Sequence, residues 1–467
     1  MGTISDKLMR IINTKEDIRR ALISKGYDVP TSIPFKEYAK MILDLPCNAD
    51  SFPDIEGIVA RYSALGLTNE QMAENPVWKD LTGNGHDLQM KNFAWKEGSG
   101  ISDVYPGFIL GDGVDDFAVT EKELNFEDTY TVYTAFIPFQ NNPTRNMILC
   151  GADSKKTFSM QYSSLVYVSF IAGNNYYINA DFVNGLNLFA CKRNGNNICI
   201  KNLLTNKVVT GTCGDWVENA GLYYLWKNAT YASFARAGIA GQIIDNGHFT
   251  TDEEDENILN WHKKQYPWLF PDQAWTVVGK TNEDEDRATI ANITGNGNDL
   301  VLSNFGFAEG SGYNEEGEYA GYLVTDGVDD KVVSKQFKFG ENFTVILDFK
   351  FPVKKISYCG FDLSAKVRIQ NLQDSGVYVV LKGNKTLIPS NVVRAVTSEG
   401  KVYDENWNEY NIVPGNISSN YTMVNLGFDG SIQFAESATK LAGIYSSTLS
   451  KDECIKAYNY LQTLKSK

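Results

Sequence analysis

Two short segments carry three carboxylates each, and carboxylate oxygens are the ligands that calcium prefers. Both read Asp-Gly-Val-Asp-Asp, so one interpretation is a calcium site in either copy. The other is a tight turn in which Asp caps, Gly takes a positive φ angle and Val enters the core. Neither segment has the length or the bidentate glutamate of an EF-hand loop, so we favour the turn and expect no cofactor. The carboxylates are Asp112, Asp115 and Asp116, and Asp326, Asp329 and Asp330.

Three aromatic stretches with amides and carboxylates beside them could bind glycan, because aromatic faces can stack on sugar rings while polar neighbours orient the ligand. Aromatic side chains are also common in cores and between domains, and that interpretation stays open for each stretch. The candidate glycan-binding residues are Tyr176, Tyr177, Trp216, Tyr403 and Trp407.

The sequence offers little evidence for a catalytic site. The acidic runs at residues 252–256 and 283–286 fall at a predicted helix start and in a predicted loop, where we interpret them as dipole-complementing or solvated charges. The histidines, His86, His248 and His262, lie near no Gly-x-Ser-x-Gly elbow, and neither a phosphate-binding loop nor a dinucleotide fingerprint occurs. We therefore expect no enzyme activity and name no catalytic residue.

The seven cysteines are odd in number and form no Cys-x-x-Cys pair, which disfavours a zinc site or a disulfide framework. Cys191 and Cys199 flank Asn194, Gly195 and Asn196. A three-residue hairpin loop there would place the two cysteines opposite each other, which leaves a disulfide open. We favour buried, reduced side chains.

Composition excludes two classes of partner. The formal net charge is −14, which disfavours binding to nucleic acid and to anionic membranes. No run of about 20 apolar residues occurs, and residues 1–25 lack the apolar core of a signal peptide. We expect synthesis in a cytoplasm and no membrane insertion.

The elements that must position these residues occur twice. Thr-Gly-Asn-Gly-x-Asp-Leu begins at Thr82 and again at Thr294, and each copy precedes one Asp-Gly-Val-Asp-Asp segment at nearly the same spacing. A repeat this long indicates tandem domains. Each unit ends in a predicted helix with a capping box, Thr251 with Glu254 and Ser450 with Glu453. Alternating polar and apolar residues predict strands at 130–139, 165–172, 187–192, 198–201 and 238–244, and at 341–351, 367–369, 376–381 and 440–445.

The predicted domain organisation has four parts. Residues 1–46 form a helical anchoring or oligomerisation segment, 47–53 a linker, 54–269 a first β domain and 270–467 a second. The helical segment has an apolar face but too few residues to bury it alone, so it should pack on another copy or on another protein. The alternative is that it folds back on the first β domain. The face comprises Ile18, Leu22, Phe35, Tyr38 and Ile42.

These phrases carry a family resemblance. Each β unit resembles the concanavalin A-like lectin/glucanase superfamily of laminin-G type, through Thr-Gly-Asn-Gly-x-Asp-Leu, Asp-Gly-Val-Asp-Asp and the closing strand and helix. The resemblance implies a mainly β protein of two tandem jelly-roll β-sandwiches behind a small α-helical segment. Some relatives bind calcium at the sandwich edge. Glucanases of this superfamily carry a Glu-x-Asp-x-x-Glu strand, which this sequence lacks.

The N-terminal segment resembles the helical N-termini of phage tail and fibre proteins, in residues 25–30 (Lys-Gly-Tyr-Asp-Val-Pro) and 33–39 (Ile-Pro-Phe-Lys-Glu-Tyr-Ala). Tandem units behind such a head resemble virion proteins of phages that infect gut Bacteroidetes. The resemblance implies a fibre or appendage subunit located in the virion. Residues 1–46 would contact other virion proteins and form a homo-oligomer, with a trimer favoured, and the lectin-like domains would bind host polysaccharide. A bacterial carbohydrate-binding protein is the alternative, and a glucanase the third.

Overall fold

A computed structural model describes Lys15, Arg19 and most of the chain from Phe52 onward. The described ranges are 52–53, 55–139, 147–152, 159–162, 167–171, 177–181, 185–214, 219–227, 234–351, 359–364, 366–372, 376–390, 392–415, 421–427 and 434–466. The predicted helical face of Ile18, Leu22, Phe35, Tyr38 and Ile42 lies outside these residues.

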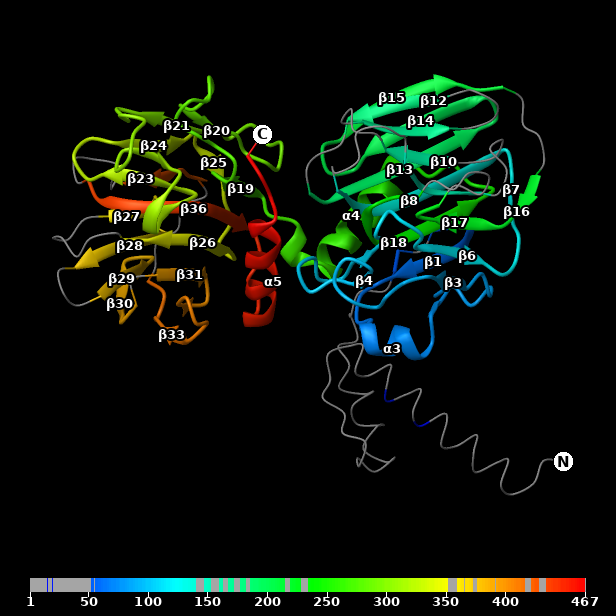
Figure 1. Cartoon of the computed structure of the whole chain (residues 1–467), viewed down its shortest axis with the longest axis horizontal. Coiled ribbons are helices and arrows are strands. Elements are labelled where there is room, and N and C mark those ends of the chain that lie inside the picture. The colour runs from blue at the N-terminus through cyan, green and yellow to red at the C-terminus, as the bar shows by residue number, and fades with distance from the viewer. Residues whose placement is uncertain are drawn as a thin grey trace. The chain divides into compact units, whose positions relative to one another are not determined.

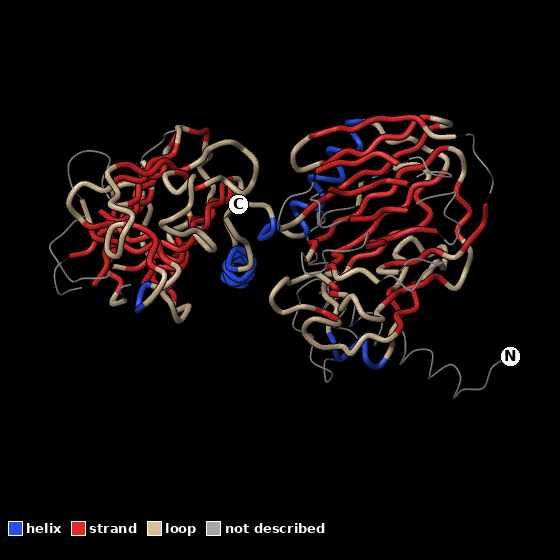
Figure 2. Tube along the Cα trace, turned by 45° about the horizontal axis from the view of Figure 1, so that its top comes forward, coloured by secondary structure: helices blue, strands red, loops and turns tan. Residues whose placement is uncertain are grey.

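The chain divides into two compact units, Met1–Gln265 (unit 1) and Tyr266–Lys467 (unit 2). Strands are the main regular element of the described part of each unit, and short helices lie beside them (Figures 1 and 2). The predicted fold class, tandem β-sandwiches, is confirmed by the sheets described below.

Unit 1 is built from two eight-stranded antiparallel sheets and a two-stranded ribbon. One large sheet runs β15-β14-β13-β8-β18-β5-β4, with β1 paired to β18, and the other runs β12-β11-β10-β9-β17-β6-β3-β2. The strands are β1 (Ile58–Ser63), β2 (Val77–Trp78), β3 (Leu88–Lys91), β4 (Gly100–Ile101), β5 (Ile109–Leu110), β6 (Phe117–Thr120), β7 (Leu124–Phe126), β8 (Thr129–Pro138), β9 (Met147–Ala152), β10 (Ser159–Tyr162), β11 (Tyr167–Ile171), β12 (Tyr177–Asp181), β13 (Asn187–Asn194), β14 (Asn197–Asn202), β15 (Lys207–Thr212), β16 (Asn219–Gly221), β17 (Tyr223–Leu225) and β18 (Ala237–Asn246). The helices are α3 (Asn69–Glu74) and α4 (Asp252–Gln265).

Unit 2 repeats this topology strand for strand, so that β19 to β36 pair in the same order as β1 to β18. Its large sheets run β22-β23-β36-β26-β31-β32-β33, with β19 on β36, and β20-β21-β24-β35-β27-β28-β29-β30. The strands are β19 (Gln273–Thr276), β20 (Thr289–Ile290), β21 (Leu300–Ser303), β22 (Gly312–Asn314), β23 (Tyr322–Asp326), β24 (Lys331–Ser334), β25 (Phe337–Lys338), β26 (Thr344–Lys350), β27 (Cys359–Leu363), β28 (Val367–Leu372), β29 (Gly376–Leu381), β30 (Asn384–Ile388), β31 (Val392–Thr397), β32 (Lys401–Tyr403), β33 (Glu409–Asn411), β34 (Tyr421–Thr422), β35 (Val424–Leu426) and β36 (Glu436–Tyr445). Its helical elements are η1 (Pro267–Leu269), η2 (Gly317–Tyr319) and α5 (Lys451–Gln462).

Each unit has its own hydrophobic core, formed by the sides of its sheets that face inward. Buried and half-buried residues alternate in β6 and β24, which were not predicted, whereas β8, at the strand predicted from alternation at 130–139, is buried along nearly its whole length. In β26, Val345, Leu347 and Phe349 belong to the core, so the residues between them lie on the other face of the sheet. That outer face positions the polar groups described below.

The closing helices begin where the capping boxes predict. In α5, the Ser450 hydroxyl accepts from the amide of Glu453, whose side chain accepts from the Ser450 amide. Thr251 and Glu254 make the same pair of contacts before α4. Each helix therefore starts with a satisfied first turn.

The repeated Thr-Gly-Asn-Gly segment is a structural loop in both units. The Asn84 side-chain amide donates to the Val59 carbonyl at 3.0 Å, and Asn296 donates to the Asp272 carbonyl at 2.6 Å. The motif thus ties a turn to the backbone of an early strand, which explains why its spacing is the same in both copies.

None of the helices in the described part of the chain combines the length and the apolar composition that a membrane crossing requires.

Candidate functional site

The Asp-Gly-Val-Asp-Asp segments are tight turns held by their own hydrogen bonds. The Asp112 carboxylate accepts from the amide of Val114 at 2.7 Å, and the Asp116 carboxylate accepts from the Asp112 amide at 3.0 Å. Unit 2 repeats both contacts at 2.8 Å, and Gly113 takes a φ of 77°. One part of the prediction was wrong: Val114 and Val328 are each 70% exposed, because the turn points them away from the core.

The same carboxylates are close enough to hold a metal ion, with one oxygen from each within 4.8 Å of the others in both triads. Several of their lone pairs already accept backbone amides, which is the arrangement of a turn. Burial, opposed by hydrogen bonds and assisted by neighbouring carboxylates, raises the pKa of Asp116 and of Asp330 to about 6. The hydrogen bonds account for the conformation of the turn without an ion, and the calcium site stays a separate prediction.

The predicted three-residue loop between Cys191 and Cys199 was wrong. The turn consists of Gly195 and Asn196, with Asn194 paired to Asn197. This shift places Cys191 opposite Ile200 and Cys199 opposite Lys192, so the two cysteines lie on different faces of the sheet. Neither cysteine forms a disulfide.

The structure describes the side chains of two of the five predicted glycan-binding residues, Tyr403 and Trp407. Tyr176 and Trp216 lie outside the described residues, and Tyr177 lies in β12, where its side chain is not described. Tyr403 is only 3% exposed and packs 6.2 Å from Trp407, ring centre to ring centre. Trp407 is half-buried and keeps part of its ring at the surface.

The β32–β33 loop fixes Trp407. The backbone φ angle of Trp407 is 61°, which is rare for a bulky residue. The Asp404 carboxylate holds the loop by accepting from the amides of Asn406 and Asn408, each at 2.9 Å, and from the Tyr410 hydroxyl at 3.0 Å. Burial opposes ionisation of Asp404, but these hydrogen bonds outweigh it and lower its pKa. Trp407 is therefore presented by an ordered loop.

Trp407 leads to a polar cluster centred on Asp348. The Trp407 ring lies 5.8 Å from the ring of Tyr458 on α5, and the Tyr458 hydroxyl donates to the Asp348 carboxylate at 3.2 Å. Asp348 also accepts from Tyr322 and Gln462, each at 2.8 Å, and pairs with Arg394. Burial disfavours the charge of Asp348, but Arg394 and these hydrogen bonds lower its pKa overall.

Two lysines complete this surface. The Lys350 ammonium lies 4.6 Å from the ring centre of Tyr319 and 4.4 Å from that of Tyr322, and the Lys440 ammonium lies 6.0 Å from the Tyr322 ring. We call the half-buried members of this group the Tyr322 surface. It consists of Tyr319, Tyr322, Lys350, Arg394, Trp407, Lys440 and Tyr458.

The surface crosses one sheet in strand order. Tyr322 lies on β23, Lys440 on β36 and Arg394 on β31, and Asp348 lies between the last two on β26. With adjacent strands about 4.8 Å apart, these positions span roughly 14 Å. Trp407 extends the row past β32.

Unit 1 has no such surface at the matching strand positions. Phe108, Ala135 and Ala240 occupy them, and all three are buried at 2% exposure or less. The sandwich and its closing helix therefore form without the charged and aromatic side chains that unit 2 carries here. Sequence reasoning missed Asp348 and Lys350, although their two-residue spacing within a predicted strand places them on one face.

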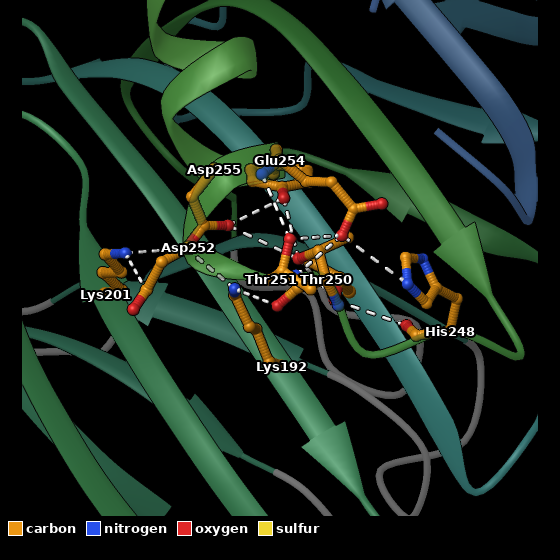
Figure 3. A network of polar contacts seen from close by, with 10 residues as sticks. Lys192, Lys201, His248, Thr250, Thr251, Asp252, Glu254 and Asp255 are labelled. Atoms are coloured by element: carbon orange, nitrogen blue, oxygen red, sulfur yellow. Dashed lines mark hydrogen bonds and ion pairs between the residues drawn. The ribbon is translucent and has the colours of Figure 1, made fainter. Parts of the chain in front are cut away.

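The corresponding polar network of unit 1 fastens α4 to its sheet (Figure 3). The Asp255 carboxylate accepts from Lys192 at 2.8 Å, Lys201 at 2.9 Å and the Tyr133 hydroxyl at 2.8 Å. Asp255 and Lys192 are 2% and 3% exposed. Asp255 lies in the first turn of α4, as a dipole-complementing charge does, but it is buried, so the interpretation as a solvated charge was wrong for this residue. Asp252, whose side chain is 95% exposed, remains a surface partner of Lys201.

His248, near the start of α4, lies between two acidic side chains, Asp245 and Glu254. Its Nδ1 lies 2.9 Å from the buried carboxylate of Asp245, and its Nε2 lies 3.6 Å from Glu254. Burial raises the pKa of Asp245 to about 7, despite the hydrogen bond and the attraction from His248. No hydroxyl or thiol nucleophile is hydrogen-bonded to this imidazole among the contacts of the described residues. The arrangement caps α4 and does not form a catalytic triad.

The described residues define a protein of two tandem antiparallel β-sandwiches. No protein-family model matches the chain, and no curated protein matches it. Among solved structures, it is similar to Trypanosoma rangeli sialidase at 12% identity, over 55% of this chain and 39% of the sialidase, with a TM-score of 0.34. It is also similar to a mutant of HCR/D at 8% identity, over 85% of this chain and 98% of that one, with a TM-score of 0.37. The chain thus spans about two fifths of the sialidase, and no activity or ligand follows from similarity this low.

Proposed function

We propose that this chain is a structural protein of a phage virion, a fibre or appendage subunit that displays two β-sandwich units and binds host surface glycan. The binding part rests on the Tyr322 surface, where aromatic rings and hydrogen-bonding groups from one sheet of unit 2 lie together with Tyr319, Trp407 and Tyr458 from the elements beside it. Such a combination suits a sugar, which offers both apolar ring faces and hydroxyls. The virion part rests on the resemblance of residues 1–46 and of the repeated units to phage proteins.

In this proposal Asp348 has a structural role and is not a catalytic acid. Asp348 is a buried carboxylate next to the Tyr322 surface, and its oxygens accept from Arg394, Tyr322, Tyr458 and Gln462. A carboxylate with this many donors and a lowered pKa is a poor general acid. Glycoside hydrolysis also needs a second carboxylate across the substrate.

Two experiments test the two parts. A glycan array probed with the whole chain tests binding, and silence across all saccharides would leave only a scaffolding role. Deletion of residues 1–46 should leave soluble β-sandwiches that no longer assemble. Normal assembly of that truncated protein would contradict the anchoring role.

The alternatives make different predictions. A bacterial carbohydrate-binding protein would bind glycan without assembling into particles. A glucanase would release reducing sugar from a β-glucan, which we expect to be absent.

A further inference from the structure

We infer that the Tyr322 surface binds an acidic saccharide, a glycan whose sugar rings carry carboxylate groups. This inference rests on the proposed glycan binding and names the class of ligand. It starts from the charges of the surface, which differ from those of the chain as a whole.

Lys350 and Lys440 are two ammonium groups that share one aromatic ring. Both approach the Tyr322 ring, at 4.4 Å and 6.0 Å, and neither forms an ion pair with any carboxylate within the described part of the chain. Among the described residues, the Lys350 ammonium donates a hydrogen bond to the backbone carbonyl of Glu318, at 3.2 Å. The attraction of the ring offsets part of the repulsion between the two ammonium groups, and an anion would offset more.

The buried carboxylate does not neutralise these lysines. Asp348 pairs with Arg394 from the neighbouring strand, while the Tyr322 hydroxyl stands between Asp348 and the ring that the lysines approach. Two acidic groups lie at the edge near Tyr319. Glu318 accepts from the Tyr319 hydroxyl at 3.0 Å, and Glu436, at the start of β36, also helps to raise the pKa of Tyr319. The middle of the surface therefore presents positive charge on a chain whose formal net charge is −14.

The aromatic groups supply the second half of the recognition. Trp407 is held on an ordered loop at one end of the row, and Tyr319 lies at the other end, on η2. A saccharide lying across the strands could stack on one of these rings while its carboxylate meets Lys350 and Lys440. A carboxylate on a sugar ring fits this distribution better than an isolated small anion, which would use the lysines alone.

The comparison of the two units supports a role in binding. The matching positions of unit 1 are Ala240 for Lys440 and Phe108 for Tyr322, both buried. Since unit 1 forms the same strand order with those residues, the fold itself does not require these lysines here. We therefore expect only unit 2 to bind the acidic saccharide at this face.

The test uses the whole chain and a panel of uronate-containing oligosaccharides, each beside its methyl ester. The ester keeps the sugar rings and removes only the charge. We expect at least one uronate to bind and its ester to bind about tenfold more weakly, because a charged hydrogen bond is lost. Binding should also weaken as salt rises from 50 to 500 mM, as screening predicts.

Variants locate the site. Lys350→Gln and Lys440→Gln should each weaken uronate binding about tenfold and leave ester binding unchanged. Trp407→Ala should weaken both ligands. Lys385→Gln is the matched control, because Lys385 lies 5.2 Å from the Tyr378 ring on the other sheet of unit 2 and should have no effect. Melting curves of each variant identify any loss that comes from unfolding.

Each outcome is decisive. Equal binding of uronates and esters, or full binding by both lysine variants, would overturn the acidic-saccharide inference while glycan binding itself stood. Binding of neutral saccharides alone would have the same consequence. If no saccharide of either kind bound, both the inference and the glycan-binding part of the proposed function would fail.

Discussion

Asp255→Asn should destabilise unit 1 strongly, since it removes only the charge at the centre of a buried cluster. The Lys192 side chain is 4% exposed and that of Lys201 is 10% exposed, so neither ammonium can recover much hydration. Lys201 would keep Asp252, but Lys192 would lose its carboxylate and keep the Thr250 carbonyl, at 2.7 Å, and the Phe249 ring, at 5.4 Å.

The size of the effect follows from this geometry. Removing one partner of a buried ion pair costs about 3–5 kcal/mol. For a unit of this size each kcal/mol shifts the melting temperature by about 2–4 °C, so unit 1 should melt roughly 6–20 °C lower. Burial disfavours the charged form of Lys201, but the hydrogen bonds that it donates to Asp252 and Asp255 raise its pKa overall. Asp252 remains in the variant and still favours the charged lysine.

Differential scanning calorimetry provides the assay, because it can separate the transitions of two units. Asp252→Asn is the matched control: it removes a carboxylate from the same helix turn, but from a side chain that is 95% exposed. Its shift should be much smaller, since exposed pairs contribute little. The reasoning is refuted if Asp255→Asn lowers the unit 1 transition no further than Asp252→Asn does, or if the unit 2 transition moves instead.

Three further predictions concern the repeated turns and the backbone. Burial, assisted by neighbouring carboxylates, raises the pKa of Asp330 from 3.8 to about 6, so this group stabilises the fold most below about pH 4 and its contribution is lost as pH rises through 6. The melting temperature of Asp330→Asn, measured relative to the parent chain, should therefore rise between pH 4 and 7, and a flat difference would contradict this. Adding millimolar calcium after chelation should leave both transitions unchanged, because the turn carboxylates already accept backbone amides; a saturable upward shift would show that they bind the ion. Gly400→Ala should cost roughly 3 kcal/mol or more, because its φ is +91° and the new Cβ would lie 1.8 Å from the Ile412 carbonyl oxygen. Gly297→Ala is the control, with a φ of +70° and no atom within 4 Å of the new Cβ, and it should cost about 1–2 kcal/mol of unfolding free energy. Equal losses for the two variants in chemical denaturation would contradict the clash at Gly400.

The sequence predicted the parts of the fold that depend on local patterns. Alternation located β8 and β26, and the spacing of Thr251 from Glu254 located the start of α4, because these signals lie within a few neighbouring residues. Local patterns also misled. The exposed Val114 was predicted to be buried because an apolar residue in a turn has no alternation to orient it.

The polar clusters could not be predicted in the same way. Asp255 meets Lys192 and Lys201 only after the sheet has brought strands about sixty residues away against α4, and its own neighbourhood is an ordinary acidic helix start. Trp407 was recognisable from its aromatic and amide neighbours. Asp348, Lys440 and Tyr322 were not, since they come from three strands that are distant in sequence and adjacent only in the sheet.

The two sandwiches share one strand order but fasten their closing helices with different chemistry. Where α4 presents Asp255 to two lysines, α5 presents the buried Cys454, and the strand positions that match Lys192 and Lys201 carry Thr397 and Tyr403. A helix that docked on the wrong sheet during folding would leave a carboxylate without cations, or two cations without a carboxylate. Repeated domains in one chain are prone to misassembly in which one domain takes up an element of the other. The different polar contacts of α4 and α5 favour docking of each helix on the sheet of its own unit.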